Sequence, residues 1–321
     1  MWKAALIGAG IIAKEHIEAL EKRTDLRVVA IADIVKEKLT NYPFRKYLNY
    51  KEMILNESPD IVIISLPHFL HKEAALFCAS QGCHILLEKP MALNTAECRE
   101  IITAAEHYNI QLLVGHIQHY FTENMVAKEI IRKEELGKVL MVKEERHMNY
   151  FVSERPDWFL DRSKSGGGVM MNIGVHSIDK LQWMLSTRFS KVLANLTFES
   201  GTHSDIEGSG IVYLQTAEGI PATILISGYQ GVPRNSTEFI CAKGMLKVET
   251  GKGVWKSVDG DYERVISPEA FSPFSSQLTE LTDAIEGKAE LENSSWYGQS
   301  VIKVVEAIYQ SHNCGEVIEL S

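Results

Sequence analysis

Two side chains able to move or stabilise charge stand out by their settings in the chain. Lys89 follows the apolar run 85–87 in "HILLEKP", and His176 comes shortly after three consecutive glycines in "SGGGVMMNIGVH". An imidazole has an unperturbed pKa near ~6.5 and accepts a proton at neutral pH. A lysine ammonium stabilises negative charge that develops on an oxygen. A site that held both groups would suit acid–base chemistry at an alcohol.

A third stretch, "LIGAGIIAKEH", has the residues needed to bind a dinucleotide. Gly8 and Gly10 begin a GxGxxA spacing, after an apolar run and before a segment with helical periodicity. In this arrangement the first glycine permits a tight turn, and the second lets the backbone approach a pyrophosphate. The helix that begins at Ile11 and Ile12 then offers amide donors and the positive end of its dipole to the anion.

The cofactor is predicted to be NAD rather than NADP. Asp33 ends the next apolar run, "RVVAIAD". An acidic side chain at this position accepts hydrogen bonds from the ribose hydroxyls and repels a 2′-phosphate. The other residues predicted at the cofactor-facing rim come from the ends of later apolar runs: Pro67, His68, His71, Glu88 and Lys89.

These residues need a parallel sheet to bring them together. The apolar runs lie at 4–8, 27–33, 60–67, 84–90 and 110–116, and segments of helical spacing lie at 11–22, 69–81 and 94–108. Continuous apolar strands that alternate with helices predict a parallel sheet covered on both faces. Ligands of such sheets bind outside the carboxyl ends of the strands. Between Asp33 and Asp60, where Pro43 interrupts the pattern, we expect a short or distorted crossover.

The pattern changes at about residue 138. Partially alternating runs at 138–149, 189–200, 208–219, 220–230, 236–250 and 251–260 predict an antiparallel sheet with one half-exposed face. Helices are predicted near 173–186, 275–287 and 296–311, followed by a short strand at 316–320. The predicted fold class is therefore α/β. It has an N-terminal Rossmann NAD-binding domain over 1–120 and a C-terminal α/β domain over 121–321 with a large, mostly antiparallel open sheet.

The second domain is predicted to bind substrate and to form a homodimer or homotetramer. Strands such as "IPATILISGYQ" carry apolar residues on both faces. One face would cover the helices of the domain, and the other would suit a second subunit.

Bulk properties exclude several classes of protein. A chain of 321 residues is longer than one core usually serves, which favours two domains. The net charge of −9 argues against a nucleic acid or an anionic membrane as the main partner. Five cysteines without CxxC spacing indicate the cytoplasm, and neither a disulfide framework nor a metal site. We expect no transmembrane helix and no signal peptide.

The order of the motifs resembles the glucose-fructose oxidoreductase / inositol dehydrogenase / MocA family. The resemblance is carried over nearly the whole chain by the GxGxxA start, "SLPHFLH", "EKP", "VGHIQHYF", "LGKV", "SGGGVMMNIGVHSIDKLQWML" and "LTELTDAIEG". It implies a Rossmann domain followed by a domain with a large antiparallel sheet. It also implies NAD(P)-dependent chemistry at a sugar or cyclitol carbon, with Lys89 in the active site and His176 as acid or base.

The predicted helix near 173–186 carries a polar stripe opposite an apolar one. At ~100° per residue, Asn172, His176, Asp179 and Trp183 share a face. Asn172 is expected to assist catalysis, whereas Asp179 either anchors the helix or contacts substrate. The preceding glycines allow the backbone near a ligand or form a flexible turn. Further substrate contacts are predicted for Tyr150, Trp158 and Arg162.

The sequence departs from the family pattern at two positions. Asn172 stands where many members carry aspartate, and an amide cannot hold a negative charge against an imidazolium. His119 stands where arginine is frequent.

Taken together, the motifs predict hydride transfer between NAD and a hydroxyl carbon of a sugar, sugar derivative or cyclitol. His176 would take the hydroxyl proton, and Lys89 would stabilise the alkoxide. Two alternatives use the same scaffold. One is a NAD-dependent glycoside hydrolase with no net consumption of NAD, and the other is a non-catalytic NAD-binding regulator.

Overall fold

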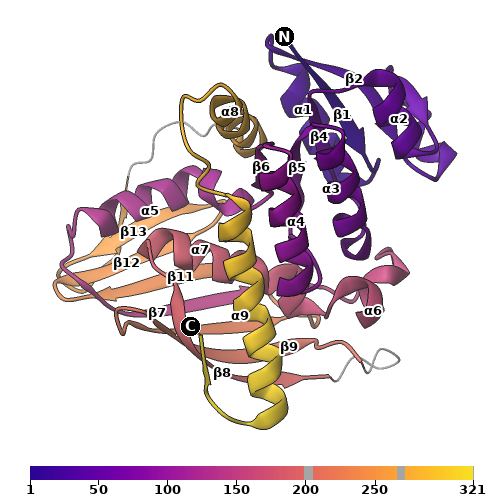
Figure 1. Ribbon diagram of the computed structural model, residues 1–321. Helices are drawn as coiled ribbons and strands as arrows, with labels where there is room; N and C mark the ends of the chain where they lie inside the picture. Colours follow the sequence, from indigo (N-terminus) through magenta and orange to yellow (C-terminus); the bar gives the residue numbers. More distant parts are fainter. Residues whose placement is uncertain (199–204, 266–271, 321) are drawn as a thin grey trace. The chain divides into compact units, whose positions relative to one another are not determined.

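The computed structural model describes residues 1–198, 205–265 and 272–320 (Figure 1). The chain divides into two compact units. The first holds Met1–His116 and Ser272–Gln299, and the second holds Ile117–Phe271 and Ser300–Ser321. Each unit is built around a sheet of its own.

The first unit has a parallel sheet with strand order β3-β2-β1-β4-β5-β6, in which every neighbouring pair is parallel. The strands are β1 (Trp2–Ile7), β2 (Leu26–Ala32), β3 (Arg45–Tyr47), β4 (Ile61–Ile64), β5 (His84–Leu87) and β6 (Leu112–Val114). Every residue of β4 and β6 is buried. The predicted doubly covered parallel sheet is confirmed. β3 lies in the segment for which only a distorted crossover was expected.

Helices alternate with these strands and cover both faces of the sheet. They are α1 (Ile11–Glu21), α2 (Tyr50–Glu57), α3 (His71–Ser80) and α4 (Thr95–His107). α4 begins after Asn94, whose side chain accepts a hydrogen bond from the amide of Glu97 and so caps the helix. α3 packs against α4 on one face.

On the other face, α1 packs against a helix from much later in the sequence, α8 (Pro273–Ile285). Leu278 and Leu281 of α8 are fully buried in the same hydrophobic core as Ile17 of α1 and Leu6 of β1. The core on this face of the first unit's sheet is therefore completed by a helix that follows β14 of the second unit in the chain.

The second unit has a sheet with strand order β14-β13-β12-β11-β7-β10-β9-β8-β15 among the described residues. These strands are β7 (Val139–His147), β8 (Phe189–Thr197), β9 (Ser209–Thr216), β10 (Pro221–Ser227), β11 (Arg234–Cys241), β12 (Gly244–Glu249), β13 (Gly253–Ser257), β14 (Glu263–Val265) and β15 (Ile318–Glu319). The β7–β10 pair is parallel and the other pairs are antiparallel. The predicted mostly antiparallel sheet is thus confirmed. Residues 199 and 200 of the predicted strand 189–200 lie outside the described residues.

The run 236–250, predicted as one strand, is a hairpin formed by β11 and β12. The chain turns before Gly244, which has a φ of 157°. A Cβ at Gly244 would lie 2.3 Å from the carbonyl oxygen of Ser257, so no larger residue fits. The glycine inside the apolar run was the signal for the turn.

The helices of the second unit are α5 (Thr122–Arg132), α6 (Arg162–Ser165), α7 (Val175–Leu185) and most of α9 (Ser295–Cys314). α5 was not predicted; it packs against α7 and against β12 and β13 (Figure 1). Across the described part of the chain, no helix combines the length and apolar character needed to cross a membrane.

The predicted helix near 173–186 differs from the structure in two ways. Residues Met170–Gly174 form a π-helical turn, and the α-helix begins only at Val175. The even 100° spacing therefore does not hold between Asn172 and His176. In addition, the polar stripe is as buried as the apolar one, since residues 175–184 are all buried.

Candidate active site

The glycine turn of the first unit has the geometry of a dinucleotide-binding loop. Gly8 has a φ of 97°, and a Cβ there would lie 2.4 Å from the carbonyl oxygen of Ser65 at the end of β4. Packing within the chain thus accounts for Gly8. A Cβ at Gly10, by contrast, would meet no atom within 4 Å. The space beside Gly10 is open, as close approach of a ligand to the backbone requires.

Asp33, predicted to contact the ribose, also ties two loops together. Its Oδ2 accepts a hydrogen bond of 2.9 Å from the amide of Ala9, and its Oδ1 accepts one of 2.8 Å from the amide of Val35. Lys38 Nζ lies 3.9 Å from Asp33 Oδ2. The carboxylate thus fixes the glycine turn and lies at the carboxyl end of β2, where the predicted ribose contact belongs.

The start of α1 exposes apolar side chains that packing within the unit does not explain. Ile11 is 82% exposed, Ile12 is 41% exposed, and Ile34, which directly follows Asp33, is 86% exposed. The N-cap of α1 is Gly10, so no side chain at that position accepts the first amide donors of the helix. Free amide donors beside exposed apolar groups fit a cofactor with a pyrophosphate and flat rings.

Glu88 of "EKP" is held by a histidine of α1, the helix predicted to bind the cofactor. His16 Nε2 lies 2.7 Å from Glu88 Oε1, and Glu88 Oε2 accepts a hydrogen bond of 3.2 Å from the amide of Lys89. Burial alone would raise the pKa of Glu88, but the hydrogen bond from His16 and the nearby charges of His16 and Lys89 lower it. The ionised carboxylate therefore faces the lysine at the end of β5.

His71 braces the same turn from the other side. Nδ1 of His71 lies 2.9 Å from the carbonyl oxygen of Pro90, and Nε2 lies 2.9 Å from that of Leu66. Burial lowers the pKa of His71, so the ring is neutral near pH 7 and donates to one carbonyl at a time. The ring is fully buried. His71 thus braces the turns that follow β4 and β5, and the cofactor contact expected for it stays a prediction.

The remaining rim residues of the first unit lie close to this brace. His68 is only 4% exposed, and its ring centroid lies 5.8 Å from that of His71. Pro67 precedes it at the end of β4, and Lys89 is half-buried. The Lys89–Pro90 peptide bond is cis. The predicted rim residues thus meet at the carboxyl ends of neighbouring strands, as a parallel sheet requires.

In the second unit the structure brings Asn172 and Tyr150 together. The side chain of Asn172 is hydrogen-bonded to the hydroxyl of Tyr150, whose pKa burial raises to about 12. Tyr150 is fully buried, and the guanidinium of Arg155 lies 3.9 Å from the centroid of its ring. Tyr150 was predicted to contact substrate. The structure gives it the side chain of Asn172 as a partner, and the substrate contact stays a prediction.

His119, the second departure from the family pattern, explains the setting of Asp179. His119 Nε2 lies 2.7 Å from Asp179 Oδ1, and both side chains are buried. The His119 ring stacks on Trp183 of α7, with centroids 4.6 Å apart. This agrees with the anchoring role considered for Asp179. His176, three residues earlier on α7, is 9% exposed.

Two of the three glycines before Asn172 are required by packing within the unit. A Cβ at Gly167 would lie 1.8 Å from the hydroxyl of Tyr309, and one at Gly168 would lie 2.1 Å from the carbonyl oxygen of Glu207. This close packing explains why positions 167 and 168 are glycine. Glu207 lies just before β9, and Tyr309 lies on α9. Sequence reasoning did not single out either residue.

The other two substrate candidates have different settings. Trp158 is half-buried and stacks on Phe159, with centroids 3.7 Å apart. Arg162 is exposed, and its guanidinium lies 5.2 Å from the ring centroid of Tyr309. Sequence reasoning also missed His16, Ile34 and the bracing function of His71. The position of His16 on α1, fewer than two turns after Gly10, could have indicated the first.

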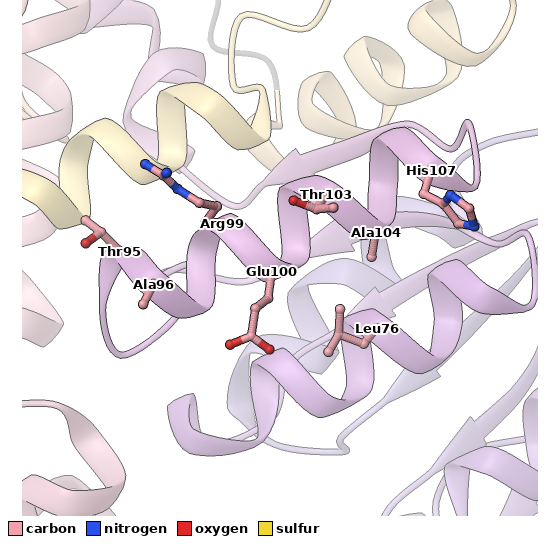
Figure 2. A pocket seen from close by; sticks show the side chains of 8 residues that line it. All are labelled: Leu76, Thr95, Ala96, Arg99, Glu100, Thr103, Ala104 and His107. Atoms are coloured by element: carbon pink, nitrogen blue, oxygen red, sulfur yellow. The ribbon is translucent and has the colours of Figure 1, made fainter.

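A groove of about 780 Å³ lies elsewhere in the first unit, along α4 beside α3 (Figure 2). Its lining is Leu76, Thr95, Ala96, Arg99, Glu100, Thr103, Ala104 and His107. None of the predicted site residues is among them. The groove is therefore separate from the residues gathered at the strand ends.

Comparison with known proteins agrees with both sheets. Residues 2–116 match the family described as "Oxidoreductase family, NAD-binding Rossmann fold", and residues 125–247 match the "GFO/IDH/MocA C-terminal domain". A solved structure, an aldose-aldose oxidoreductase from Caulobacter crescentus, superposes with a TM-score of 0.91 over 99% of both chains at 23% identity. That likeness shows the fold.

Two curated relatives are enzymes. The chain is 27% identical over 276 residues to a glucose-6-phosphate 3-dehydrogenase of Bacillus subtilis. The aligned region covers 81% of this chain and 78% of that enzyme. It is 26% identical over 226 residues to an inositol 2-dehydrogenase of Salmonella typhimurium, which covers 68% of this chain and 65%, just under two thirds, of that enzyme.

Both domain matches cover most of the chain, in the order that the motifs predicted. The first brings an NAD-binding Rossmann domain with an open space beside Gly10, and the second brings the domain that carries Asn172 and His176. This chain belongs to the glucose-fructose oxidoreductase / inositol dehydrogenase / MocA family of NAD-binding oxidoreductases.

Proposed function

We propose that this oxidoreductase transfers a hydride between NAD and a hydroxyl carbon of a sugar, sugar derivative or cyclitol. Family membership supports the reaction class, and the names of the two dehydrogenase relatives support the substrate class. The observation that carries the proposal is the placement of Glu88 and Lys89. They lie at the carboxyl end of β5, in the same unit as the open space beside Gly10.

Each catalytic residue has a defined part in this proposal. When bound, the nicotinamide accepts or returns the hydride. His176 accepts the hydroxyl proton in the direction of oxidation, because a neutral imidazole is a base near pH 7. Lys89 stabilises the negative charge that grows on the oxygen as that proton leaves. The ionised carboxylate of Glu88 keeps the lysine ammonium charged.

Asn172 supports the same step without a charge of its own. Its amide is already directed by the hydroxyl of Tyr150. A fixed amide orients a sugar hydroxyl or the imidazole by hydrogen bonding, whereas a carboxylate would also hold the imidazolium. Trp158 and Arg162 are proposed to contact the sugar at the edge of the site.

The test is a screen followed by one variant. Purified protein is incubated with NAD and with cyclitols, free aldoses, sugar phosphates or nucleotide-linked uronates, and NADH absorbance is followed. A dehydrogenase forms NADH in proportion to product, whereas a hydrolase that only borrows the hydride leaves NAD unchanged. The screen therefore also distinguishes a dehydrogenase from a NAD-dependent glycoside hydrolase.

With the substrate that turns over, Lys89→Ala should lower kcat by about 10²-fold or more, because the developing oxyanion loses its charged partner. The dissociation constant for NADH should change by less than about tenfold. NADH binding is measured by fluorescence on the same preparations. Wild-type turnover in Lys89→Ala would remove the proposed role of this lysine.

We also propose that the protein is a homo-oligomer joined through the exposed face of the second unit's sheet. Ile211 of β9 and Met141 of β7 are 62% and 46% exposed on this face. Leu193 pairs with Tyr213, and Ile211 pairs with Leu225, across neighbouring strands. Such an apolar face on a sheet suits a second copy. The cytoplasmic location predicted from cysteine usage stays a prediction.

A further inference from the structure

The glycine run and the π-helical turn that carry Asn172 are attached to a buried glutamate. Glu207 is 1% exposed. Its Oε2 accepts a hydrogen bond of 2.9 Å from the amide of Gly168, and its Oε1 accepts one of 2.7 Å from the amide of Met170. The amide of Val169, between them, donates to the main-chain carbonyl of Glu207 at 3.0 Å. One residue thus binds three successive amides.

Tyr309 of α9 completes this attachment. Its hydroxyl donates a hydrogen bond of 2.9 Å to Oε1 of Glu207. The same hydroxyl occupies the space that a Cβ at Gly167 would need. The glutamate and the tyrosine therefore fix the backbone from Gly167 to Met170 by hydrogen bonds and by shape.

The attached segment leads directly to the proposed catalytic residues. The backbone N–H of Asn172 donates a hydrogen bond of 3.1 Å to the carbonyl of Gly168. The backbone position of Asn172 therefore depends on that of Gly168, which Glu207 holds. His176 follows in the first turn of α7. A displacement of Met170 would be passed on to both side chains, because the π-helical turn and α7 are continuous.

We propose that Glu207, oriented by Tyr309, is a positioning residue that sets the place of Asn172 and His176. The inference rests on the proposed function of those two residues. The carboxylate must be ionised for this task, since both of its oxygens accept hydrogen bonds and neither donates. It also bonds amides at the start of the π-helical turn, where a negative charge is stabilising. Burial raises the pKa of Glu207, although the amide and hydroxyl donors oppose the rise.

The test compares Glu207→Gln and Tyr309→Phe with a control on the same helix. The amide of Glu207→Gln is an isostere of the protonated acid and places an NH₂ group where an acceptor is needed. Ser311→Ala is the matched control, because Ser311 is fully buried on α9 and its hydroxyl bonds the amide of Ala194 and the carbonyl of Glu316. It loses comparable hydrogen bonds away from the π-helical turn.

The first readout needs no substrate. Hydrogen exchange of the full-length protein, followed by mass spectrometry on peptides that cover 165–176, should be at least about tenfold faster in Glu207→Gln and somewhat faster in Tyr309→Phe. Ser311→Ala should leave exchange in this segment unchanged. Unchanged hydrogen exchange in both Glu207→Gln and Tyr309→Phe would overturn the proposal.

The second readout separates positioning from mere stability. In turnover with the substrate found by the NADH screen, Glu207→Gln should lower kcat by about tenfold or more, because small displacements of catalytic groups are costly. The dissociation constant for NADH should stay within about twofold, and Ser311→Ala should keep wild-type kcat at a similar melting temperature. Faster exchange with wild-type kcat would also overturn the proposal. Wild-type turnover in His176→Ala would instead refute the proposed function, while the exchange result would still decide whether the clamp exists.

Discussion

At the scale of single residues, the glycines of the two sequence motifs differ in what requires them. Gly8, Gly167 and Gly168 are glycines because the chain itself fills the space that a Cβ would need. Gly10 is different, since nothing within 4 Å of its missing Cβ explains it. The fold therefore does not require glycine at position 10, and its place in the GxGxxA motif assigns it to the cofactor; this assignment can be measured.

Gly10→Ala should fold nearly as well as the wild type and bind NADH more weakly by about tenfold or more. Its φ of −79° suits alanine, and the change from glycine at an N-cap costs at most about 1 kcal/mol of unfolding free energy. The new methyl group would occupy the space into which the pyrophosphate must come. NADH fluorescence titration and a thermal melt measure the two effects.

Gly231→Ala serves as the control for this experiment. Gly231 also has open space beside it, but it belongs to the second unit. It should leave both NADH affinity and the melting temperature unchanged. Undiminished NADH affinity in Gly10→Ala would contradict the assignment of this turn to the cofactor.

At the scale of elements, two buried histidines hold the turns at the carboxyl ends of β4 and β5. His16 reaches from α1 to Glu88, and His71 reaches from the start of α3 to the carbonyls of Leu66 and Pro90. Lys89 is thus attached to α1 through Glu88 and to the end of β4 through His71. Its backbone position depends on helices as well as on its own strand.

The brace at His71 predicts a specific pH dependence of stability. Burial lowers the pKa of His71 below its usual 6.5, so the unfolded chain binds a proton at this histidine more readily than the folded one. Its contribution to the unfolding free energy is complete above pH 6.5 and is lost as the pH falls toward the folded-state value. His71→Gln should therefore flatten the decline of the melting temperature below pH 6.5.

The exposed His107 on α4 provides the control for His71. His107→Gln should show the same decline as the wild type when melting temperatures are compared between pH 7.5 and 5. Parallel curves for His71→Gln and the wild type would show that this ring does not couple folding to protonation.

Much of this element scale was predictable from sequence. Apolar runs and helical periodicity predicted β1, β4 and β5 with α1, α3 and α4, because parallel strands and their helices have distinct periods. The strand-end position of Lys89 followed from that alternation. The partners of the site residues were not predictable, since His16 with Glu88 and His119 with Asp179 are joined only by tertiary packing. The π-helical turn was not predictable for a similar reason, because the amide of Met170 at its start bonds Glu207, which lies 37 residues later in the chain.

At the scale of the whole molecule, the helical spacing of 275–287 gives no indication of which sheet that helix covers. The structure assigns α8 to the first unit, where it buries Leu278 and Leu281 against α1 and β1. The chain therefore crosses from the second unit back to the first, and α9 returns it to the second. Cores made from distant segments depend on long-range contacts that periodicity does not record.

The outer face of the second unit's sheet supports the last prediction. Part of this face is apolar, with Ile211 62%, Leu193 39% and Tyr213 37% exposed. Another part is charged and internally paired, as in the 3.0 Å ion pair of Lys143 with Glu145. An apolar patch beside satisfied charges is typical of a surface that a second subunit covers.

Ile211→Arg should convert the proposed oligomer to monomers, because a buried guanidinium without a partner is costly at an interface between two copies. The side chain points away from the core, so folding should be unaffected. Light scattering coupled to size-exclusion chromatography measures the molar mass, and a thermal melt checks the fold. Leu55→Arg is the matched control, since Leu55 is similarly exposed, at 61%, but lies on α2 of the first unit. An unchanged oligomer in Ile211→Arg, or a wild-type protein that is already monomeric, would rule out this face as the interface.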